Sequence, residues 1–144
     1  MHELPHFYSV TVDASAHDTL RCNTGNLPEL VVAPPTQFDG PGDQWSPEEL
    51  LMAAVANCFV LSFRTVADIA KLEWESIQCQ AQGELDKVAR TMLFTTITTK
   101  VKLQLKDIDS KSKAETLLKK AEKICIVSNS LSAEKHLEIE IVDS

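Results

Sequence analysis

The chain has 144 residues, of which 44% are hydrophobic and 24% charged, and its formal net charge at pH 7 is −7. This size and composition predict one globular domain over residues 1–144 and exclude the disordered and fibrous classes of protein. Because the acidic residues are spread along the chain, the negative charge argues against binding to the phosphate backbone of nucleic acids.

The N-terminus and the longest apolar segment bear on the location of the protein. The first ten residues, MHELPHFYSV, contain no basic stretch that leads into an apolar run, as a secretion signal would. The segment 50–63 is nearly apolar, but it is shorter than a membrane span and is interrupted by Asn57. We therefore expect a soluble, cytoplasmic protein that does not bind membranes.

The N-terminal third predicts short strands followed by a loop. Alternating apolar and polar residues indicate a strand at 7–12, and two shorter strand candidates follow at 19–22 and 30–32. The turn-forming residues 23–26 separate the last two, so we expect a three-stranded meander. Segment 33–45 holds three of the six prolines and two of the four glycines, which predicts a loop.

The stretch SPEELLMAAVANCF, residues 46–59, combines a helix start with an apolar continuation. Ser46 suits the N-cap, Pro47 suits the first helical position, and Glu49 completes a capping box. The following residues are apolar on nearly every side of a helix, and we expect this helix to reach about Lys71. Since one small sheet cannot cover such a helix, the pattern predicts an obligate homodimer.

The remainder of the chain predicts two strands, a helix and a last strand. Apolar and polar residues alternate over 74–85 and again over 93–105, which indicates antiparallel strands joined around 86–90. Segment 112–125 has the apolar stripe of an amphipathic helix, and 136–142 alternates as a strand. The order of elements predicts an α+β fold.

The chain contains four cysteines, namely Cys22, Cys58, Cys79 and Cys125. They form no C-x2-C pair and no cluster with histidine, so the sequence predicts no metal site. Cys79 alternates with polar residues on the apolar face of a predicted strand, which favours simple packing. The same interpretation is favoured for Cys22, although Arg21 lies beside it.

Cys58 and Cys125 lie on predicted helices whose apolar faces point to the core. The residues alone leave two interpretations open for this pair. Both thiols can be small core side chains, or they can form a redox pair.

Two segments resemble the signature segments of the OsmC/Ohr family, which contains osmotically inducible protein C and the organic hydroperoxide resistance proteins. The first is SPEELLMAAVANCF at 46–59, and the second is AEKICIVSNSL at 121–131. The resemblance extends over essentially the whole chain and is closer to the broad OsmC-like branch than to the Ohr enzymes. It implies an intertwined homodimer, in which antiparallel β-sheets wrap around long central helices and the active sites lie at the subunit interface.

The resemblance also implies a thiol-dependent peroxidase that reduces organic hydroperoxides without a cofactor. Cys58 would attack the peroxide and become a sulfenic acid, and Cys125 would resolve it by forming a disulfide. A dithiol reductant, for example of the lipoyl type, would then reopen the disulfide. The apolar surroundings expected for the helix favour organic peroxides over hydrogen peroxide.

Two further residues correspond to the family's site by position. Glu48 matches the active-site glutamate, but ten residues at ~1.5 Å rise place it ~15 Å along the helix from Cys58. Either the helix start is irregular, or Glu48 serves the site of the other subunit, or it is only an acidic residue favoured at a helix start.

Arg21 is the candidate cation that would keep Cys58 ionised. The glycine-containing turn that carries this arginine in Ohr-type members is absent from residues 12–22. Arg64 follows Cys58 by six residues on another helical face and does not serve it directly.

These departures keep a second function open. In this alternative the chain is a non-catalytic dimer that binds an apolar small molecule at the subunit interface. Cys58 and Cys125 are then retained for packing.

Overall fold

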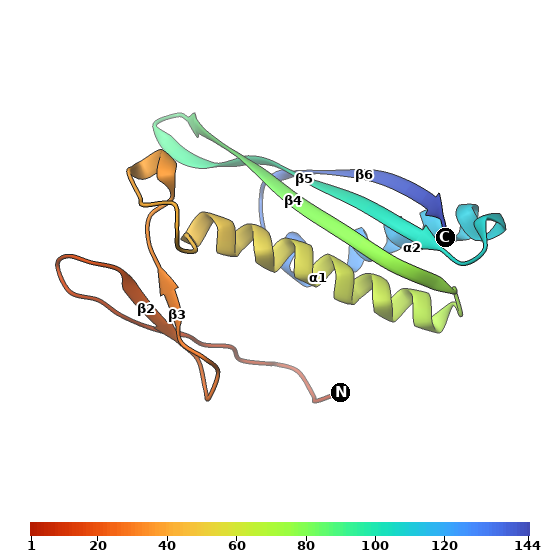
Figure 1. Cartoon of the computed structure of the whole chain (residues 1–144), viewed down its shortest axis with the longest axis horizontal. Coiled ribbons are helices and arrows are strands. Elements are labelled where there is room, and N and C mark those ends of the chain that lie inside the picture. Colours follow the sequence, from red (N-terminus) through yellow and green to blue (C-terminus); the bar gives the residue numbers. More distant parts are fainter. The chain divides into compact units, whose positions relative to one another are not determined.

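The structure, a computed structural model, describes all 144 residues and confirms the predicted α+β fold. Figure 1 shows its elements in chain order. Two compact units are distinguished, residues 1–51 and residues 52–144, and each contains a three-stranded sheet. The two units are described separately below, and a single domain over 1–144 stays a prediction.

The N-terminal unit contains the predicted three-stranded meander. Its antiparallel strands are β1 (Thr11–Asp13), β2 (Leu20–Asn23) and β3 (Leu30–Val32), with β2 in the centre. The predicted strand at 7–12 is wrong in extent, because only Thr11–Asp13 have partners on β2. Phe7 and Tyr8 are 89% and 88% exposed, so their alternation does not reflect a half-buried strand within this unit.

A loop with one short 3-10 helix, η1 (Thr36–Phe38), leads to the first long helix. Gly40 is required there, because a Cβ atom at this position would overlap the carbonyl of Pro34. The helix α1 (Pro47–Ile69) begins at the predicted position. The Glu49 N–H donates to Ser46 Oγ at 3.1 Å, and the buried Ser46 hydroxyl donates to Glu49 Oε1 at 2.8 Å.

The helix α1 is longer than the apolar run that predicted it. Its 23 residues are long and apolar enough to cross a membrane, a criterion that the core helix of a soluble protein also meets. Five of its residues are nevertheless buried in the core, namely Val55, Phe59, Phe63, Val66 and Ala67. The helix ends at Ile69, and Lys71 takes a positive φ of 57°, which stops the helical path.

The sheet of residues 52–144 is built on a long hairpin. Strands β4 (Trp74–Val88) and β5 (Thr91–Leu105) pair antiparallel, as predicted. The hairpin turns at Ala89 and Arg90, and both have positive φ, as a tight two-residue hairpin turn requires. The last strand, β6 (Glu134–Asp143), pairs with the other side of β5.

Strand β6 runs parallel to β5, so this sheet is mixed rather than wholly antiparallel. A parallel neighbour requires a crossover connection. The short 3-10 helix η2 (Ile108–Ser110), helix α2 (Lys111–Ile124) and the single-turn helix α3 (Ile126–Asn129) provide it. Helix α2 agrees with the predicted helix at 112–125 to within one residue at each end, and Cys125 separates it from α3.

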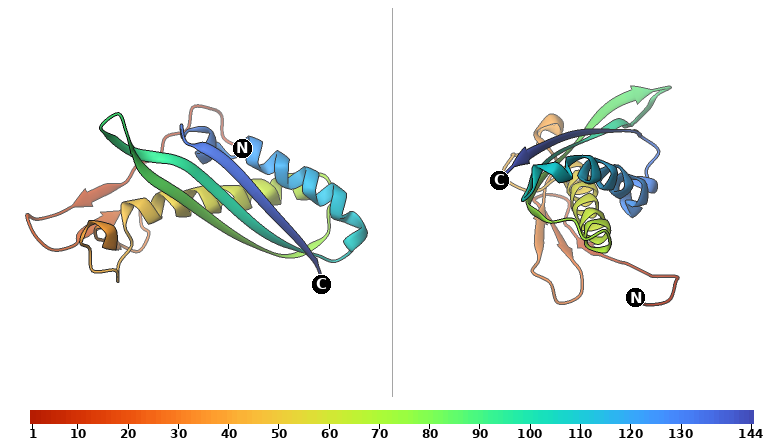
Figure 2. Two further views of the ribbon diagram at one scale, coloured as in Figure 1. Left: turned by 90° about the horizontal axis from the view of Figure 1, so that it is seen from above. Right: turned by 90° about the vertical axis from the view of Figure 1, so that its right-hand side faces the viewer.

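The core of residues 52–144 lies between the sheet and its two helices. Figure 2 shows α1 and α2 on the same face of the β4–β5–β6 sheet. One cluster joins Phe59 and Phe63 of α1 to Leu103 of β5 and Leu118 of α2. A second, smaller cluster joins Val55 of α1 to the segment that includes α3. This second cluster fixes α3 against α1 one turn before Cys58.

Candidate active site

Cys58 lies on α1 between the two core clusters. Its helical neighbours Val55 and Phe59 are 1% and 2% exposed, whereas Cys58 itself is only half-buried. The helix therefore holds the thiol at the margin of the core, where solvent still reaches it. Ser62 follows four residues later on the same helical face.

Cys125 lies between α2 and α3 and is 1% exposed. Its backbone is extended, with φ −64° and ψ 107°, which separates the two helices. Ala121 anchors the preceding turn in the core, and Val127 anchors the following turn on the smaller cluster that contains Val55. These contacts bring the Cys125 thiol against the Cys58 thiol, so the two cysteines that are 67 positions apart in the chain meet.

The two thiols have opposite electrostatic environments. Burial would raise the pKa of Cys58, but hydrogen bonds from the backbone of Val127, the Cys125 thiol, the backbone of Ile126 and the Ser62 hydroxyl together lower it below its ordinary value. Burial raises the pKa of Cys125, and the proximity of Cys58 adds to this effect, although Ser128 acts in the opposite direction. Cys58 is therefore the thiol that ionises more readily, and Cys125 remains protonated.

Cys79 is a third thiol near this pair. It lies on β4 and packs against the larger core cluster. Burial raises the pKa of Cys79 to about 11, and the neighbouring Cys125 contributes to the same direction. This agrees with the predicted packing role. Cys22 lies on β2 in the N-terminal unit, and all four cysteines are free thiols.

The other two predicted site residues belong to residues 1–51. Glu48 lies in the first turn of α1 and is half-buried, and its Oε1 atom is buried without a hydrogen-bond partner. Arg21 is exposed on β2, opposite Asp13 of β1, and lines a hollow with Asp13 and Asp18. The roles of Glu48 and Arg21 at the thiol site stay predictions.

Arg64 gives no support as an alternative cation. It is exposed on α1 and lines a hollow with Asp68 and Trp74. It is not among the groups that shift the pKa of Cys58. Within residues 52–144, the groups that favour the Cys58 thiolate are thus all neutral hydrogen-bond donors.

These donors were not among the residues predicted to form the site. The spacing of Cys58 and Ser62 was visible as an i, i+4 pair on a predicted helix. The contribution of Ile126 and Val127 could not be read from the sequence, because it depends on how the turn after Cys125 packs in the tertiary fold. No group of three or more histidine, cysteine or acidic residues is placed to hold a metal ion.

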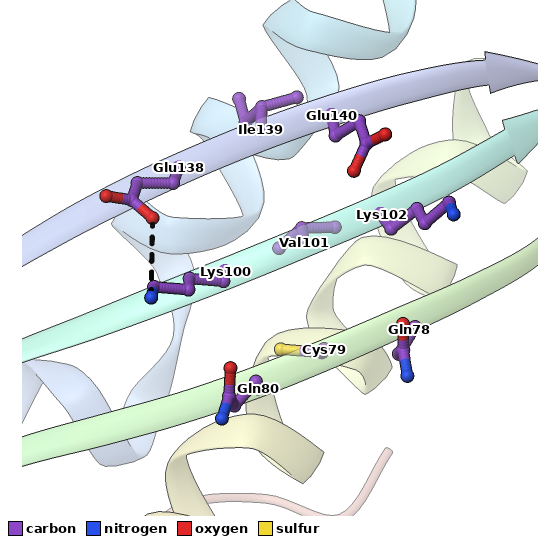
Figure 3. Close-up of a pocket in the computed structure, with 9 residues that line it drawn as sticks. All are labelled: Gln78, Cys79, Gln80, Lys100, Val101, Lys102, Glu138, Ile139 and Glu140. Atoms are coloured by element: carbon purple, nitrogen blue, oxygen red, sulfur yellow. Dashed lines mark ion pairs between the residues drawn. The ribbon is translucent and has the colours of Figure 1, made fainter.

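The opposite face of the β4–β5–β6 sheet carries a hollow of about 580 Å³ that is separate from the thiol pair. Figure 3 views this face, with the helices behind the sheet. On this face, polar side chains of neighbouring strands lie side by side. Gln80 of β4, Lys100 of β5 and Glu138 of β6 form one such row. The Lys100–Glu138 ion pair is long, at 4.0 Å, and well exposed, which is typical of a solvated sheet face.

Comparison with known proteins identifies the fold and the family. The sequence model described as OsmC-like protein matches residues 40–140. The chain is 27% identical over 139 residues to the uncharacterized protein YmaD of Bacillus subtilis, covering 94% of this chain and 92% of that protein. It is 33% identical over 106 residues to peroxiredoxin OsmC of Escherichia coli, covering 74% of this chain and 73% of that protein.

The fold is also similar to that of a solved OsmC-like protein from Vibrio cholerae. The TM-score is 0.86 at 18% sequence identity, with 94% of this chain and 99% of the other covered. The family match over most of the chain and the shared fold lead to one conclusion: the chain belongs to the OsmC/Ohr family.

Proposed function

We propose that the protein is a thiol-dependent peroxidase that reduces organic hydroperoxides through Cys58 and Cys125. The observation that carries this proposal is the contact between two thiols whose pKa values are shifted in opposite directions. A peroxidatic cysteine must be a thiolate, and its resolving partner must lie within reach. The name of the Escherichia coli relative, a peroxiredoxin, supports the same activity.

The reaction has three steps. The Cys58 thiolate attacks one peroxide oxygen of ROOH, the O–O bond breaks, and the other oxygen leaves as ROH after it takes up a proton. Cys58 is then a sulfenic acid. The Cys125 thiol attacks the Cys58 sulfur, water leaves, and a disulfide forms. An external dithiol reduces this disulfide, becomes a disulfide itself and restores both thiols.

The environments of the two thiols suit this sequence of steps. Cys58 is only half-buried, so a peroxide can reach its sulfur, whereas Cys125 is almost fully buried behind it. The side chains of Leu61 and Ile126 near the pair are 57% and 76% exposed and would give an organic peroxide an apolar contact surface. This supports a preference for organic hydroperoxides over hydrogen peroxide.

A homodimer is part of the proposal. On α1, Ile69 is exposed despite being large and apolar, and Phe7 and Tyr8 are exposed in the N-terminal unit. A second chain that covers these residues would remove their apolar surface from water. Light scattering should then give twice the chain mass of 15.9 kDa. A mass of one chain at micromolar concentration would reject the dimer.

Disulfide mapping tests the mechanism. Reduced protein is mixed with one equivalent of cumene hydroperoxide, quenched with an alkylating reagent after seconds to minutes, digested and analysed by mass spectrometry. We expect a Cys58–Cys125 disulfide in the unmodified protein. We expect none in Cys58→Ser, and the matched control Cys79→Ser should form it normally.

Two outcomes would contradict the proposal. If both thiols remain unreacted after minutes, the alternative of a non-catalytic dimer that binds an apolar small molecule is favoured. If hydrogen peroxide forms the disulfide as fast as cumene hydroperoxide does, the peroxidase remains but its preference for organic substrates is rejected.

A further inference from the structure

The net charge of the protein is unevenly distributed. Residues 1–51 contain eight acidic residues and one basic residue, whereas residues 52–144 contain 13 of each kind. Helix α2 carries five lysines and only two glutamates. It is therefore a basic surface in a chain whose net charge is −7, and it attracts an acidic partner that much of the chain repels.

The lysines of α2 gather on the solvent side of the helix. Its core side is formed by four buried residues, namely Ala114, Leu117, Leu118 and Ala121. At about 100° of rotation per residue, four lysines lie within an arc of about 120°, and both glutamates lie outside that arc. Together these four exposed residues form the lysine face, namely Lys113, Lys119, Lys120 and Lys123.

No carboxylate neutralises the lysine face. The ion pairs of the structure, Lys100–Glu138 and His136–Glu134, lie on the β4–β5–β6 sheet. Glu115 precedes Lys119 by four residues, a spacing that favours an ion pair on a helix, but the two do not pair. The four ammonium groups are therefore free to interact with a partner.

The lysine face adjoins the thiol pair. Lys123 lies two residues before Cys125, and Lys113 lies twelve residues before it. At a rise of ~1.5 Å per residue, the face extends from ~3 Å to ~18 Å from Cys125 along the helix axis. Ile124 lies beside these lysines and is 42% exposed although it is large and apolar. A partner bound here would therefore have charged and apolar contacts close to both Cys58 and Cys125.

We propose that the lysine face is the docking surface for the reductant, which is an acidic protein that displays a dithiol. The inference rests on the proposed function, because that reaction leaves a Cys58–Cys125 disulfide that an external dithiol must reduce. The attraction between opposite charges brings the partner to α2 and orients its dithiol toward the disulfide. An uncharged hydroperoxide gains nothing from this attraction, so the lysine face serves only the second half of the cycle.

The thiol–disulfide exchange has two steps. A thiolate of the partner attacks Cys58 Sγ, because Cys58 is half-buried whereas Cys125 is only 1% exposed. A mixed disulfide forms, the Cys58–Cys125 bond breaks, and Cys125 leaves and takes up a proton. The second partner thiol then gives up its proton and attacks the mixed disulfide. The partner's own disulfide forms, Cys58 leaves as a thiolate, and two electrons have passed to the protein.

Two synthetic dithiol peptides test the docking surface. Both contain the sequence Cys-Gly-Pro-Cys, which is flanked by runs of glutamate in the acidic peptide and by runs of serine in the neutral peptide. The full chain is first oxidised with diamide, so that its disulfide forms without peroxide. The return of free Cys58 and Cys125 is then followed by alkylation and mass spectrometry. The measured quantity is the rate with the acidic peptide divided by the rate with the neutral peptide, in which changes of intrinsic disulfide reactivity cancel.

The lysine face is altered by combining Lys120→Glu with Lys123→Glu. The matched control combines Lys87→Glu with Lys102→Glu, which changes the net charge equally at exposed positions of the β4–β5 hairpin. At an ionic strength of about 0.1 M, charges more than ~10 Å apart are largely screened. We expect the rate ratio to fall by roughly fivefold to tenfold in the α2 variant and by less than about twofold in the control. Further salt should lower the ratio of the unmodified protein.

Three outcomes would overturn the inference. An equal decrease in both variants would show that net charge alone governs the rate. An unchanged ratio in the α2 variant, with its fold confirmed by circular dichroism, would remove the docking surface; if the chain then binds vesicles that contain phosphatidylserine, the lysines serve a membrane. A change of the molecular mass of the α2 variant in light scattering would assign the lysine face to contact with a second copy. If the variant does not fold, Lys120→Gln with Lys123→Gln gives the same test with about half the effect on the logarithm of the ratio.

Treatment with cumene hydroperoxide keeps this result apart from the proposed function. A ratio that depends on α2, without disulfide formation by the peroxide, rejects the peroxidase and retains the docking surface. Disulfide formation by the peroxide with a ratio that does not depend on α2 does the reverse. Failure of diamide to form the Cys58–Cys125 disulfide would also overturn the inference, because the partner would have no disulfide to reduce.

Discussion

Cys58 and Cys79 are half-buried thiols of the same unit, but their pKa values are shifted in opposite directions. Burial raises the pKa of Cys79 to about 11, and nothing around Cys79 opposes that effect. Burial acts on Cys58 as well, but several hydrogen-bond donors outweigh it and lower its pKa. The comparison teaches that the donors around a thiol, rather than its exposure, decide whether its pKa falls or rises.

The largest expected effect is on the rate of peroxide reduction, which should depend on Cys58 and not on Cys79. Cys58→Ser removes the nucleophile, so the rate of cumene hydroperoxide consumption should fall by at least about a hundredfold. Cys79→Ser should stay within about twofold of the unmodified protein, because Cys79 has no role in the proposed reaction. Both rates are measured with a saturating dithiol. Loss of activity in both variants, with both folded, would remove the distinction between the thiols.

A smaller effect is expected in their reactivity toward a neutral alkylating reagent at pH 7. A pKa of about 11 rather than below 9 leaves Cys79 with a thiolate fraction at least ~100-fold smaller than that of Cys58. The more basic thiolate is intrinsically more nucleophilic, which returns about a tenfold factor. Mass spectrometry should therefore find Cys58 labelled at least about tenfold faster than Cys79. Equal labelling rates would contradict the opposite shifts.

The smallest effect concerns stability at alkaline pH. The pKa of Cys79 is higher in the folded protein than its ordinary value of 9.0, so its contribution to stability is complete below pH 9 and is lost as the pH rises toward about 11. After allowance for partial exposure, this loss is about 1–2 kcal/mol. The free energy of unfolding is measured with urea at pH 8 and pH 10.5. Its decrease between the two pH values should be smaller in Cys79→Val than in the unmodified protein. If the free energy of unfolding decreases as much in Cys79→Val as in the control Cys22→Val, groups other than Cys79 cause the decrease.

Much of the fold could be predicted because local signals were strong. The capping residues Ser46 and Glu49 located the start of α1, and alternation located β4, β5 and β6. Alternation does not give the direction of a strand, and the parallel pairing of β6 was therefore not foreseen. The strand predicted at 7–12 was too long, because alternation cannot reveal whether a residue has a pairing partner.

The candidate site was predictable in part. The pairing of Cys58 with Cys125 came from the family resemblance, since residues 67 positions apart can be brought together only by the tertiary fold. The structure places these two thiols in contact. The donors from Ser62 and the α3 turn were not predicted, because their positions depend on how the turn after Cys125 packs on the cluster that contains Val55.

The parallel pairing of β5 with β6 has a consequence for the order of folding. The β4–β5 hairpin is a local structure that can form early, whereas a parallel pair must wait until the whole crossover has closed. Cys125 lies inside that crossover, and Cys58 lies before the hairpin. The native contact of the two thiols therefore needs the crossover to pack onto α1, which is a non-local step. We expect this late closure to protect the nascent chain from a premature disulfide, so that an oxidant meets the thiol pair only in a chain whose crossover has packed onto α1.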